Sequence, residues 1–417
     1  MSSPSYSAVL RTRHAPGAFG AALLGRLSYG MVALSLMLAV TDATGSYSVA
    51  GVVMALFGAA SVLLSPARAA LIDRYGPRRA LPPMALAYAL PLAALAHATW
   101  QPGASGLRLG ALAVVAGACT PPLGPVMRTL WSALIPDRAL LQRAYSLDGV
   151  AEELLFVTGP MLVGLLVTFS VPAAGVAVSA GLVLAGALAL AFSPAARGAG
   201  RAAPAAAPAA APVRRNRMLL RRAAGLRHAV LAMAALGLSL GALDLLVVAF
   251  AERHGQGAAA AWALAALSAG GAAGGLAYGA VTWRSSGRTR LAALLAALGV
   301  ALTAAGLSPD VRVLVAFAGV AGLFVAPAIT TAYLLADESV EPGSRTQAGA
   351  WANTAFNAGT SVGMAAVGLL VDRLPAAVCF AVAALPALLA AGVIAHRART
   401  LRPSQRRASA QAPLERT

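Results

Sequence analysis

The chain has 417 residues, of which 59% are hydrophobic and 11% are charged, with a mean hydropathy of +0.75. A soluble domain carries about 25% charged residues, so this composition excludes a soluble globular protein and indicates a polytopic membrane protein. The formal net charge of +18 would suggest nucleic-acid binding in a soluble chain. Here the basic residues lie in short segments between apolar runs, so we expect no nucleic-acid partner.

About twelve apolar runs are each long enough to cross roughly 30 Å of hydrocarbon as a helix. The sequence therefore predicts an all-α membrane protein with twelve transmembrane helices. We expect the spans near residues 17–41, 48–66, 81–100, 107–127, 147–169, 172–193, 228–251, 258–280, 290–307, 312–335, 346–371 and 375–396. No convincing cleavage site follows the first run, which we interpret as a retained span and not as a signal peptide.

The arginines are distributed unevenly between alternate loops. All 32 basic residues are arginine, and 27 of them lie in the N-terminal segment, the loops from even to odd spans and the C-terminal tail. The opposite loops hold only Arg108, Arg253, Arg312 and Arg373, and Arg26 lies inside a span. The positive-inside rule therefore predicts that both termini are cytoplasmic. The Ala-, Gly- and Arg-rich composition suggests a GC-rich bacterial genome, so we expect a multi-pass protein of the bacterial cell membrane.

A segment rich in alanine and proline, and then in arginine, divides the spans into two sets of six. We interpret 195–227 as a semi-rigid cytoplasmic linker with an arginine patch attracted to anionic lipid. The predicted organisation is an N-terminal six-helix half at 1–194, this linker, a C-terminal six-helix half at 228–396 and a cytoplasmic tail at 397–417. Weak similarities, such as DRYGPRR and RSSGRTR 211 residues apart, indicate two pseudo-symmetric halves around a central cavity.

The loop between the second and third spans, SPARAALIDRYGPRRAL, carries one aspartate among four arginines. It fits the pattern G-x-L-a-D-R-x-G-R-R, except that Ala69 replaces the leading glycine and Pro77 replaces a basic residue. The matching residues are Leu71, Asp73, Arg74, Gly76 and Arg78, with Arg79 just beyond them. With its twelve spans, its six-plus-six repeat and its long central loop, the chain resembles the major facilitator superfamily over essentially its whole length.

The residue types of this loop suit a gate. Gly76 permits a tight turn, the arginines hold the loop at the anionic leaflet, and Asp73 can accept hydrogen bonds from a helix N-terminus or pair with an arginine. The resemblance implies that Asp73 helps to latch the two halves together on the cytoplasmic side. The alternative is a basic loop that only sets the topology. In the second half Arg284 stands where Asp73 would fall, so any latch is one-sided.

Two glycine patterns add to the resemblance. The fifth span resembles the G-P-x-x-G-G pattern of exporters in the family, although Val163 replaces one glycine; the matching residues are Gly159, Pro160 and Gly164. The eighth span holds SAGGAAGG, with two pairs of glycines four residues apart: Gly270, Gly271, Gly274 and Gly275. The resemblance implies that these spans meet across the halves, which favours export. The alternative is that the glycines serve general helix packing.

A charge inside a span costs roughly 2.5–3.5 kcal/mol or more, so each such residue is a candidate for function. We expect Arg26 to pair with Glu153 of the fifth span, with Glu152 as the rival partner; the alternative is a purely structural ion pair. Asp244 lies deep in the seventh span without an obvious cationic partner. It is a candidate for proton coupling, because its protonation can differ between conformations. The alternative is a neutral, hydrogen-bonded packing residue.

The eleventh span carries a polar stripe that we expect to face a cavity or a neighbouring helix. The stripe consists of Asn353, Asn357 and Ser361, and Tyr29 is expected to line the same space. Ser361 also lies in GTSVG, which fits the G-x-S-x-G pattern of hydrolases. No strand precedes it and all five histidines lie at or beyond span ends, so we predict no catalytic residue and no enzyme. We find no metal, nucleotide or haem motif and expect no cofactor.

The sequence thus predicts a secondary active transporter that works by alternating access, most plainly a proton-coupled antiporter for the efflux of small amphiphilic or drug-like compounds. Its partners would be a small-molecule substrate, protons and membrane lipids, and we expect a monomer. The first alternative is a facilitator that imports a sugar, an amino acid or an organic acid. A remote alternative is an intramembrane enzyme or a non-transporting sensor. Carboxylates without a nearby cation would favour cation export, and a cavity dominated by arginine would favour anion uptake.

Overall fold

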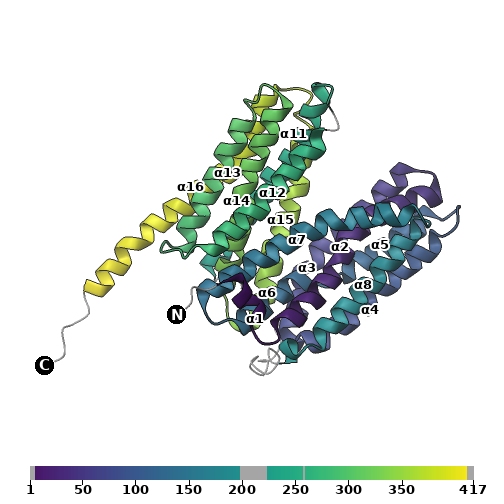
Figure 1. The fold of residues 1–417 in the computed structure, drawn as a ribbon, viewed down its shortest axis with the longest axis horizontal. Helices are drawn as coiled ribbons and strands as arrows, with labels where there is room; N and C mark the ends of the chain where they lie inside the picture. Colours follow the sequence, from purple (N-terminus) through teal and green to yellow (C-terminus); the bar gives the residue numbers. More distant parts are fainter. Residues whose placement is uncertain (1–4, 198–222, 257–258, 411–417) are drawn as a thin grey trace. The chain divides into compact units, whose positions relative to one another are not determined.

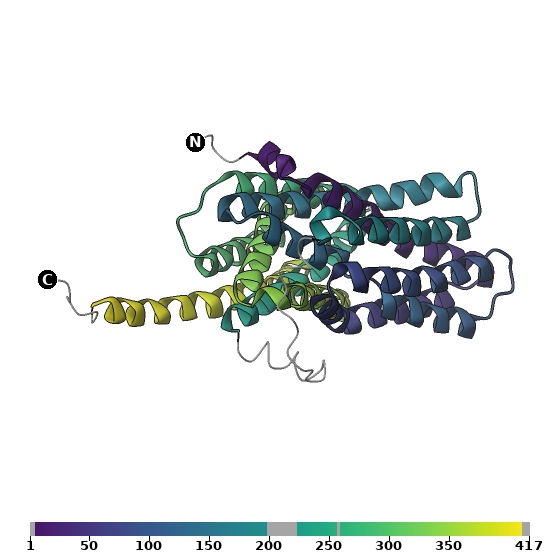
Figure 2. The same ribbon diagram turned by 90° about the horizontal axis from the view of Figure 1, so that it is seen from below.

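The computed structural model describes residues 5–197, 223–256 and 259–410, and within these residues the chain is helical with no strand (Figure 1, Figure 2). The first half contains α1 (Tyr6–Arg11), α2 (Ala15–Thr44), α3 (Tyr47–Tyr75), α4 (Pro77–Ala98), α5 (Gly106–Cys119), α6 (Leu123–Leu134), α7 (Arg138–Val167) and α8 (Ala173–Ala191). The second half contains α11 (Ala224–Arg253), α12 (Ala259–Ala280), α13 (Gly287–Ala305), α14 (Val311–Glu338), the 3₁₀ turn η1 (Pro342–Ser344), α15 (Arg345–Gly368) and α16 (Ala376–Ala410).

The predicted all-α membrane architecture is confirmed. Within the described residues, 11 helical segments are long and apolar enough to cross a membrane, when α5 and α6 are taken together as Gly106–Leu134. The eleventh predicted span, near 346–371, corresponds to α15, which carries the polar stripe and is not among those 11. The predicted linker falls mostly on 198–222 and the end of the tail on 411–417, which lie outside the described residues.

The chain divides into two compact units. The first comprises Met1–Leu226 together with Ala336–Thr354, and the second comprises Arg227–Leu335 with Ala355–Thr417. The end of α14, the η1 turn and the start of α15 therefore group with the first unit, although the sequence analysis assigned them to the C-terminal half. This returning segment includes the residues that contact the predicted gating loop.

The predicted fourth span is interrupted, which the sequence analysis did not anticipate. Pro121 and Pro122 have no N–H to donate, so α5 ends at Cys119 and α6 starts at Leu123. Lipid offers no hydrogen bonds, so the freed backbone groups need partners inside the protein. Arg68 of α3 supplies them, since its Nη1 donates to the carbonyls of Gly117 (3.0 Å) and Ala118 (2.8 Å).

The break is also held from α2. The Tyr29 hydroxyl donates to the carbonyl of Pro121 at 2.5 Å, and the Thr120 hydroxyl donates to the carbonyl of Gly117 at 3.0 Å. Tyr29 was predicted to line a cavity, and it lies against the interruption of the fourth span. A side chain from each of α2 and α3 thus fixes the point at which this span changes direction.

Glycines let the helices of the first unit approach closely. A Cβ on Gly30 of α2 would collide with the carbonyl oxygen of Leu155 in α7, and one on Gly159 would lie 2.8 Å from the Cα of Gly30. A Cβ on Gly186 of α8 would lie 2.5 Å from the Cα of Gly25. Helix α2 is therefore packed backbone to backbone against both α7 and α8, as small residues permit in membrane helices.

The glycines of the eighth span pack in the same way inside the second unit. A Cβ on Gly270 of α12 would collide with the carbonyl of Gly319 in α14, and one on Gly274 would lie 2.7 Å from the Cα of Leu323. Gly271 is also directed at α14, whereas a Cβ on Gly164 of α7 would meet nothing within 4 Å. Gly275 is buried and Pro160 is exposed. These close approaches are made within each unit, and the expected contact of the two spans across the halves stays a prediction.

We predict that Gly30→Ala destabilises the protein by roughly 1–3 kcal/mol, because the added methyl group must displace the backbone of α7. Gly20→Ala in the same helix is the matched control, because a Cβ there meets nothing within 4 Å. The control should be neutral or slightly more stable, since alanine is the better helix former. Thermal unfolding of both variants in detergent micelles measures the difference, and equal midpoints would contradict the close contact.

Candidate functional site

Four buried charges meet inside the first unit, and we call them the charge cluster: Arg26, Arg128, Asp148 and Glu152. Arg26 of α2 places Nη1 at 2.7 Å from Asp148 Oδ1 and Nη2 at 2.8 Å from Glu152 Oε2. Arg128 of α6 places Nε at 3.2 Å from Asp148 Oδ2 and Nη2 at 2.6 Å from Glu152 Oε2. Each arginine thus contacts both acids, and the cluster carries no net charge when all four groups are ionised.

The helical repeat of α7 explains which acids are used. Asp148 and Glu152 are four residues apart and therefore share one face of the helix, which points at both arginines. Glu153 is the next residue along and is turned by about 100° from Glu152. The expected Arg26–Glu153 pair was therefore wrong, and the rival partner Glu152 takes its place.

Burial makes the cluster costly to disturb. The side chains of Asp148, Arg26 and Arg128 are 0%, 3% and 7% exposed, whereas that of Glu152 is 31% exposed. Removing one partner of a buried ion pair leaves an uncompensated charge and typically costs 3–5 kcal/mol. Glu152 is therefore the least buried member of the cluster.

Arg128 and Asp148 are candidate functional-site residues that the sequence did not single out. The apolar run of the fourth span ends at residue 127, which predicts Arg128 in a loop, whereas α6 continues to Leu134. Asp148 stands at the edge of the predicted fifth span, whereas α7 starts at Arg138, where the Asp137 side chain accepts from the N–H of Leu140 at 2.7 Å. The i, i+4 spacing of Asp148 and Glu152 was the available signal.

The predicted gating loop joins α3 to α4. Gly76 is the single residue between the end of α3 and the start of α4. Its φ of 78° is a backbone conformation that suits glycine. Arg74 places its guanidinium 5.1 Å from the ring centre of Tyr75, and Arg78 and Arg79 are exposed. The loop is thus a sharp turn with its basic side chains on the outside.

Asp73 of this loop binds the start of α15. Its Oδ1 accepts from the N–H of Thr346 at 3.2 Å and its Oδ2 accepts from the N–H of Gln347 at 2.8 Å. The first N–H groups of a helix have no partner in their own helix, and the positive end of the helix dipole favours a carboxylate. The sequence allowed Asp73 to bind either a helix N-terminus or an arginine. The structure shows it bound to the N-terminus of α15.

Further polar contacts hold the returning segment Ala336–Thr354 to the first unit. Arg138 of α7 forms an exposed ion pair with Glu338 at 2.9 Å. Arg345 donates to the Ser132 hydroxyl at 3.2 Å, and the hydroxyls of Thr129 and Thr346 lie 3.1 Å apart. Asp73 is thus one of several groups on α3, α6 and α7 that contact this segment.

The remaining predicted residues lie on α11 and α15. Asp244 is half-buried in α11, between the middle of the helix and its C-terminal end. Among the described residues it makes no hydrogen bond or ion pair. Asn353, Asn357 and Ser361 follow one another along one face of α15, and Asn353 and Asn357 are half-buried. The Ser361 hydroxyl donates to the carbonyl of Asn357 at 3.2 Å inside a continuous helix, which is not the strand-to-helix turn of a nucleophilic serine.

The described part of the chain contains no candidate metal site: no group of three or more His, Cys, Asp or Glu side chains there could hold a metal ion. The described residues offer charge pairing in the charge cluster, a half-buried carboxyl group at Asp244 and the side-chain amides of α15.

The chain is similar to a known protein family and to several solved structures. A family profile described as Major Facilitator Superfamily matches residues 18–302 and 229–416. No curated protein matches the sequence. Among solved structures, the human organic anion transporter MFSD10 (TETRAN) superposes with a TM-score of 0.74 at 16% identity, covering 92% of this chain and 99% of that chain.

A bacterial homologue of the iron transporter ferroportin, in an outward-facing state, also superposes with a TM-score of 0.74 at 15% identity, covering 92% of this chain and 99% of that chain. The same homologue with soaked iron gives 0.68 at 14% identity, with 91% and 97% covered. At these identities the likeness concerns the fold alone.

We predict that Asp148→Asn lowers stability by several kcal/mol, because two buried arginines then share one carboxylate. Asp42→Asn, at an exposed position in the last turn of α2, should change stability by less than about 1 kcal/mol. Chemical or thermal unfolding of the two purified variants in the same detergent tests this ranking. An Asp42→Asn loss that equals the Asp148→Asn loss would contradict the pairing.

Proposed function

This chain belongs to the major facilitator superfamily, and we propose that it is a secondary active transporter that exchanges protons for small amphiphilic or drug-like compounds, in the direction of efflux. It works by alternating access as a monomer in the bacterial cytoplasmic membrane. Both termini lie in the cytoplasm, in accord with the arginine asymmetry between the loops. The gating loop and the start of α15 then lie on the cytoplasmic side.

The observation that carries this proposal is the contrast between Asp244 and the other acids buried in the spans. Asp148 and Glu152 each contact two arginines, whereas Asp244 of α11 makes no hydrogen bond or ion pair among the described residues. An acid in a membrane helix is expensive and marks a functional site. A carboxylate without a cation beside it can hold either a proton or a positively charged substrate, and competition between the two is what antiport requires.

The charge cluster supports the same transport cycle from the first unit. When Glu152 is ionised, its Oε2 holds Nη2 of both Arg26 and Arg128. A proton on Glu152 removes that attraction and gives the cluster a net charge of +1, while Asp148 still holds both arginines. Such a change repels a cation and alters the contacts between α2, α6 and α7, so protonation at Glu152 is a second point of coupling.

The arginines favour a second candidate, proton-coupled transport of an organic acid. Arg26 and Arg128 both reach the partly exposed Glu152, so a protonated Glu152 would leave two guanidinium groups available to a substrate carboxylate. One of the structures with this fold is an organic anion transporter. A screen in inverted vesicles, with and without a pH gradient, separates the candidates if it includes ethidium as the cation and carboxyfluorescein as the anion.

We predict that Asp244→Asn abolishes uphill efflux while it retains substrate binding or gradient-free exchange, because an amide cannot release a proton. Glu252→Gln near the end of the same helix is the matched control and should retain uphill efflux. Both activities are measured in the same proteoliposomes, with the substrate that the screen identifies. An Asp244→Asn variant that still concentrates the substrate against its gradient would leave Asp244 a structural role, and Glu152 and Glu153 would be the next candidates.

We predict that Asp73→Asn reduces turnover about tenfold while insertion into the membrane is unchanged. The amide loses the charge and one of the two oxygens that accept from α15, and a hydrogen bond to a charged group is worth about 1.5–3 kcal/mol. The arginines that set the topology remain. Asp42→Asn, at an exposed position in the last turn of α2, is the control. Initial transport rates, normalised to the amount of protein in the membrane, give the readout, and a wild-type rate for Asp73→Asn would exclude the latch.

A further inference from the structure

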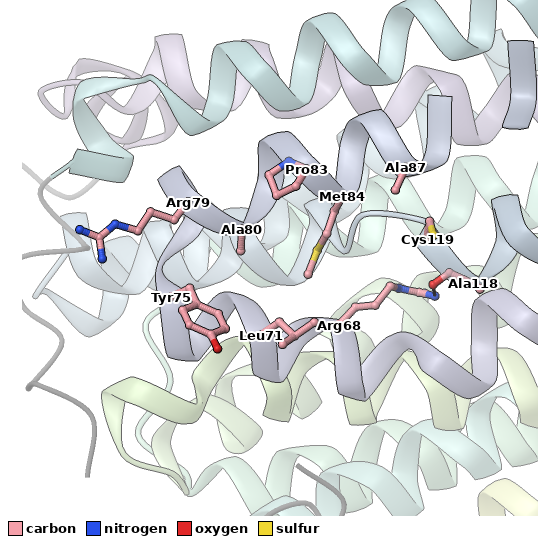
Figure 3. A pocket seen from close by; sticks show the side chains of 10 residues that line it. All are labelled: Arg68, Leu71, Tyr75, Arg79, Ala80, Pro83, Met84, Ala87, Ala118 and Cys119. Atoms are coloured by element: carbon pink, nitrogen blue, oxygen red, sulfur yellow. Dashed lines mark hydrogen bonds between the residues drawn. The ribbon is translucent and has the colours of Figure 1, made fainter. Parts of the chain in front are cut away.

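A groove in the first unit lies between α3 and α4 and belongs to none of the sites described so far. Its volume is about 530 Å³, within the roughly 300–1,000 Å³ typical of ligand pockets. Its walls are apolar, formed by Leu71, Pro83 and Met84 among others, and Tyr75 and Arg79 stand at one end (Figure 3). Cys119, at the end of α5, lies at the other end.

The end of the groove near the α3–α4 turn is basic. Arg79 lines it directly, and Arg78 is exposed in the same first turn of α4. The hydroxyl of Tyr75 adds a hydrogen-bond donor, and its ring is covered by the Arg74 guanidinium at 5.1 Å. None of the residues that line the groove is acidic. An anionic group at this end would therefore meet arginines without competition from a carboxylate.

The inner end of the groove is closed by Arg68. This side chain is 7% exposed, and its guanidinium is directed at the carbonyls of Gly117, Ala118 and Ser61. Its aliphatic stem therefore faces the groove, while its Nη1 and Nη2 are already bonded. The walls in between are open to the outside of the unit, since Leu71 is 41% exposed and Pro83 and Ala87 are exposed.

We propose that this groove binds an anionic phospholipid of the cytoplasmic leaflet. The phosphate lies at Arg78, Arg79 and the Tyr75 hydroxyl, and one acyl chain lies along Leu71 and Met84. Basic pockets between transmembrane helices on the cytoplasmic side are suited to anionic lipid headgroups. The side of the membrane follows the proposed topology, but binding itself can be measured without a transport assay and without knowledge of the substrate.

Cys119 provides a reporter inside the groove. It is partly exposed, whereas Cys379 is 0% exposed, so a neutral maleimide on the folded protein reports on Cys119, with Cys119→Ser as the blank. The full chain is placed in nanodiscs of phosphatidylcholine, or of phosphatidylcholine with phosphatidylglycerol. We expect labelling to be about fivefold slower with phosphatidylglycerol. Equal rates in the two lipids would overturn the proposal.

The arginines of the α3–α4 turn should account for the protection. Arg78→Gln with Arg79→Gln should abolish the effect of phosphatidylglycerol on the labelling rate. The matched control is Arg284→Gln with Arg288→Gln, which removes the same charge from the turn before α13 and from the first turn of α13. Protection that survives the first double variant, or that is lost equally in the control, would show a general effect of surface charge and overturn the assignment.

A second measurement separates a lipid from a free anion and does not depend on Cys119. In detergent, phosphatidylglycerol should raise the thermal unfolding midpoint, and Met84→Trp, which fills the groove, should remove that rise. Glycerol phosphate without acyl chains should give no rise. A rise of the same size with glycerol phosphate, or an undiminished rise in Met84→Trp, would overturn the lipid assignment. Ala87→Phe provides a second groove-filling variant if Met84→Trp does not fold.

Discussion

The structure of the first unit depends on four charges that satisfy one another away from bulk water. Each arginine contacts both acids, at 2.6–3.2 Å, and the four groups come from three separate helices. In a low-dielectric interior an ion pair is favourable only when it is completed by further contacts. The cluster therefore fixes how α2, α6 and α7 pack together. The glycine contacts of Gly30 and Gly159 allow the helices to approach closely enough for the charges to meet.

A second polar system acts at the edge of the same unit. Asp73 caps the start of α15, and Arg138 and Ser132 reach the same returning segment. A helix N-terminus offers several N–H groups but only a partial charge, so each of these contacts is individually modest. Their number and their partial exposure suit a connection that must form and break during a transport cycle, whereas the charge cluster is buried and suits a connection that persists.

The sequence was sufficient to predict the spans, because twelve apolar runs leave little freedom in a membrane. It also identified Asp73, since a loop pattern of fixed spacing specifies the residue and its place. It did not identify Arg128, because hydropathy places the end of a helix where polarity begins, and α6 continues through this arginine. The choice between Glu152 and Glu153 required the rotation of α7, which adjacent identical residues do not reveal. The break before α6 was signalled by Pro121 and Pro122 but depends on acceptor contacts to Arg68 and Tyr29 from other helices.

The interruption of the fourth span has a mechanical consequence. Helix α6 has 12 residues and is about 18 Å long, so it is a short rod and not a membrane span in its own right. The N–H of Leu123 bonds to Pro121 and does not reach back to α5, so α6 is a helical segment of its own. Because α6 carries Arg128 near its middle and Ser132 a turn later, any displacement of this segment would act on the charge cluster and on the contact with α15 together.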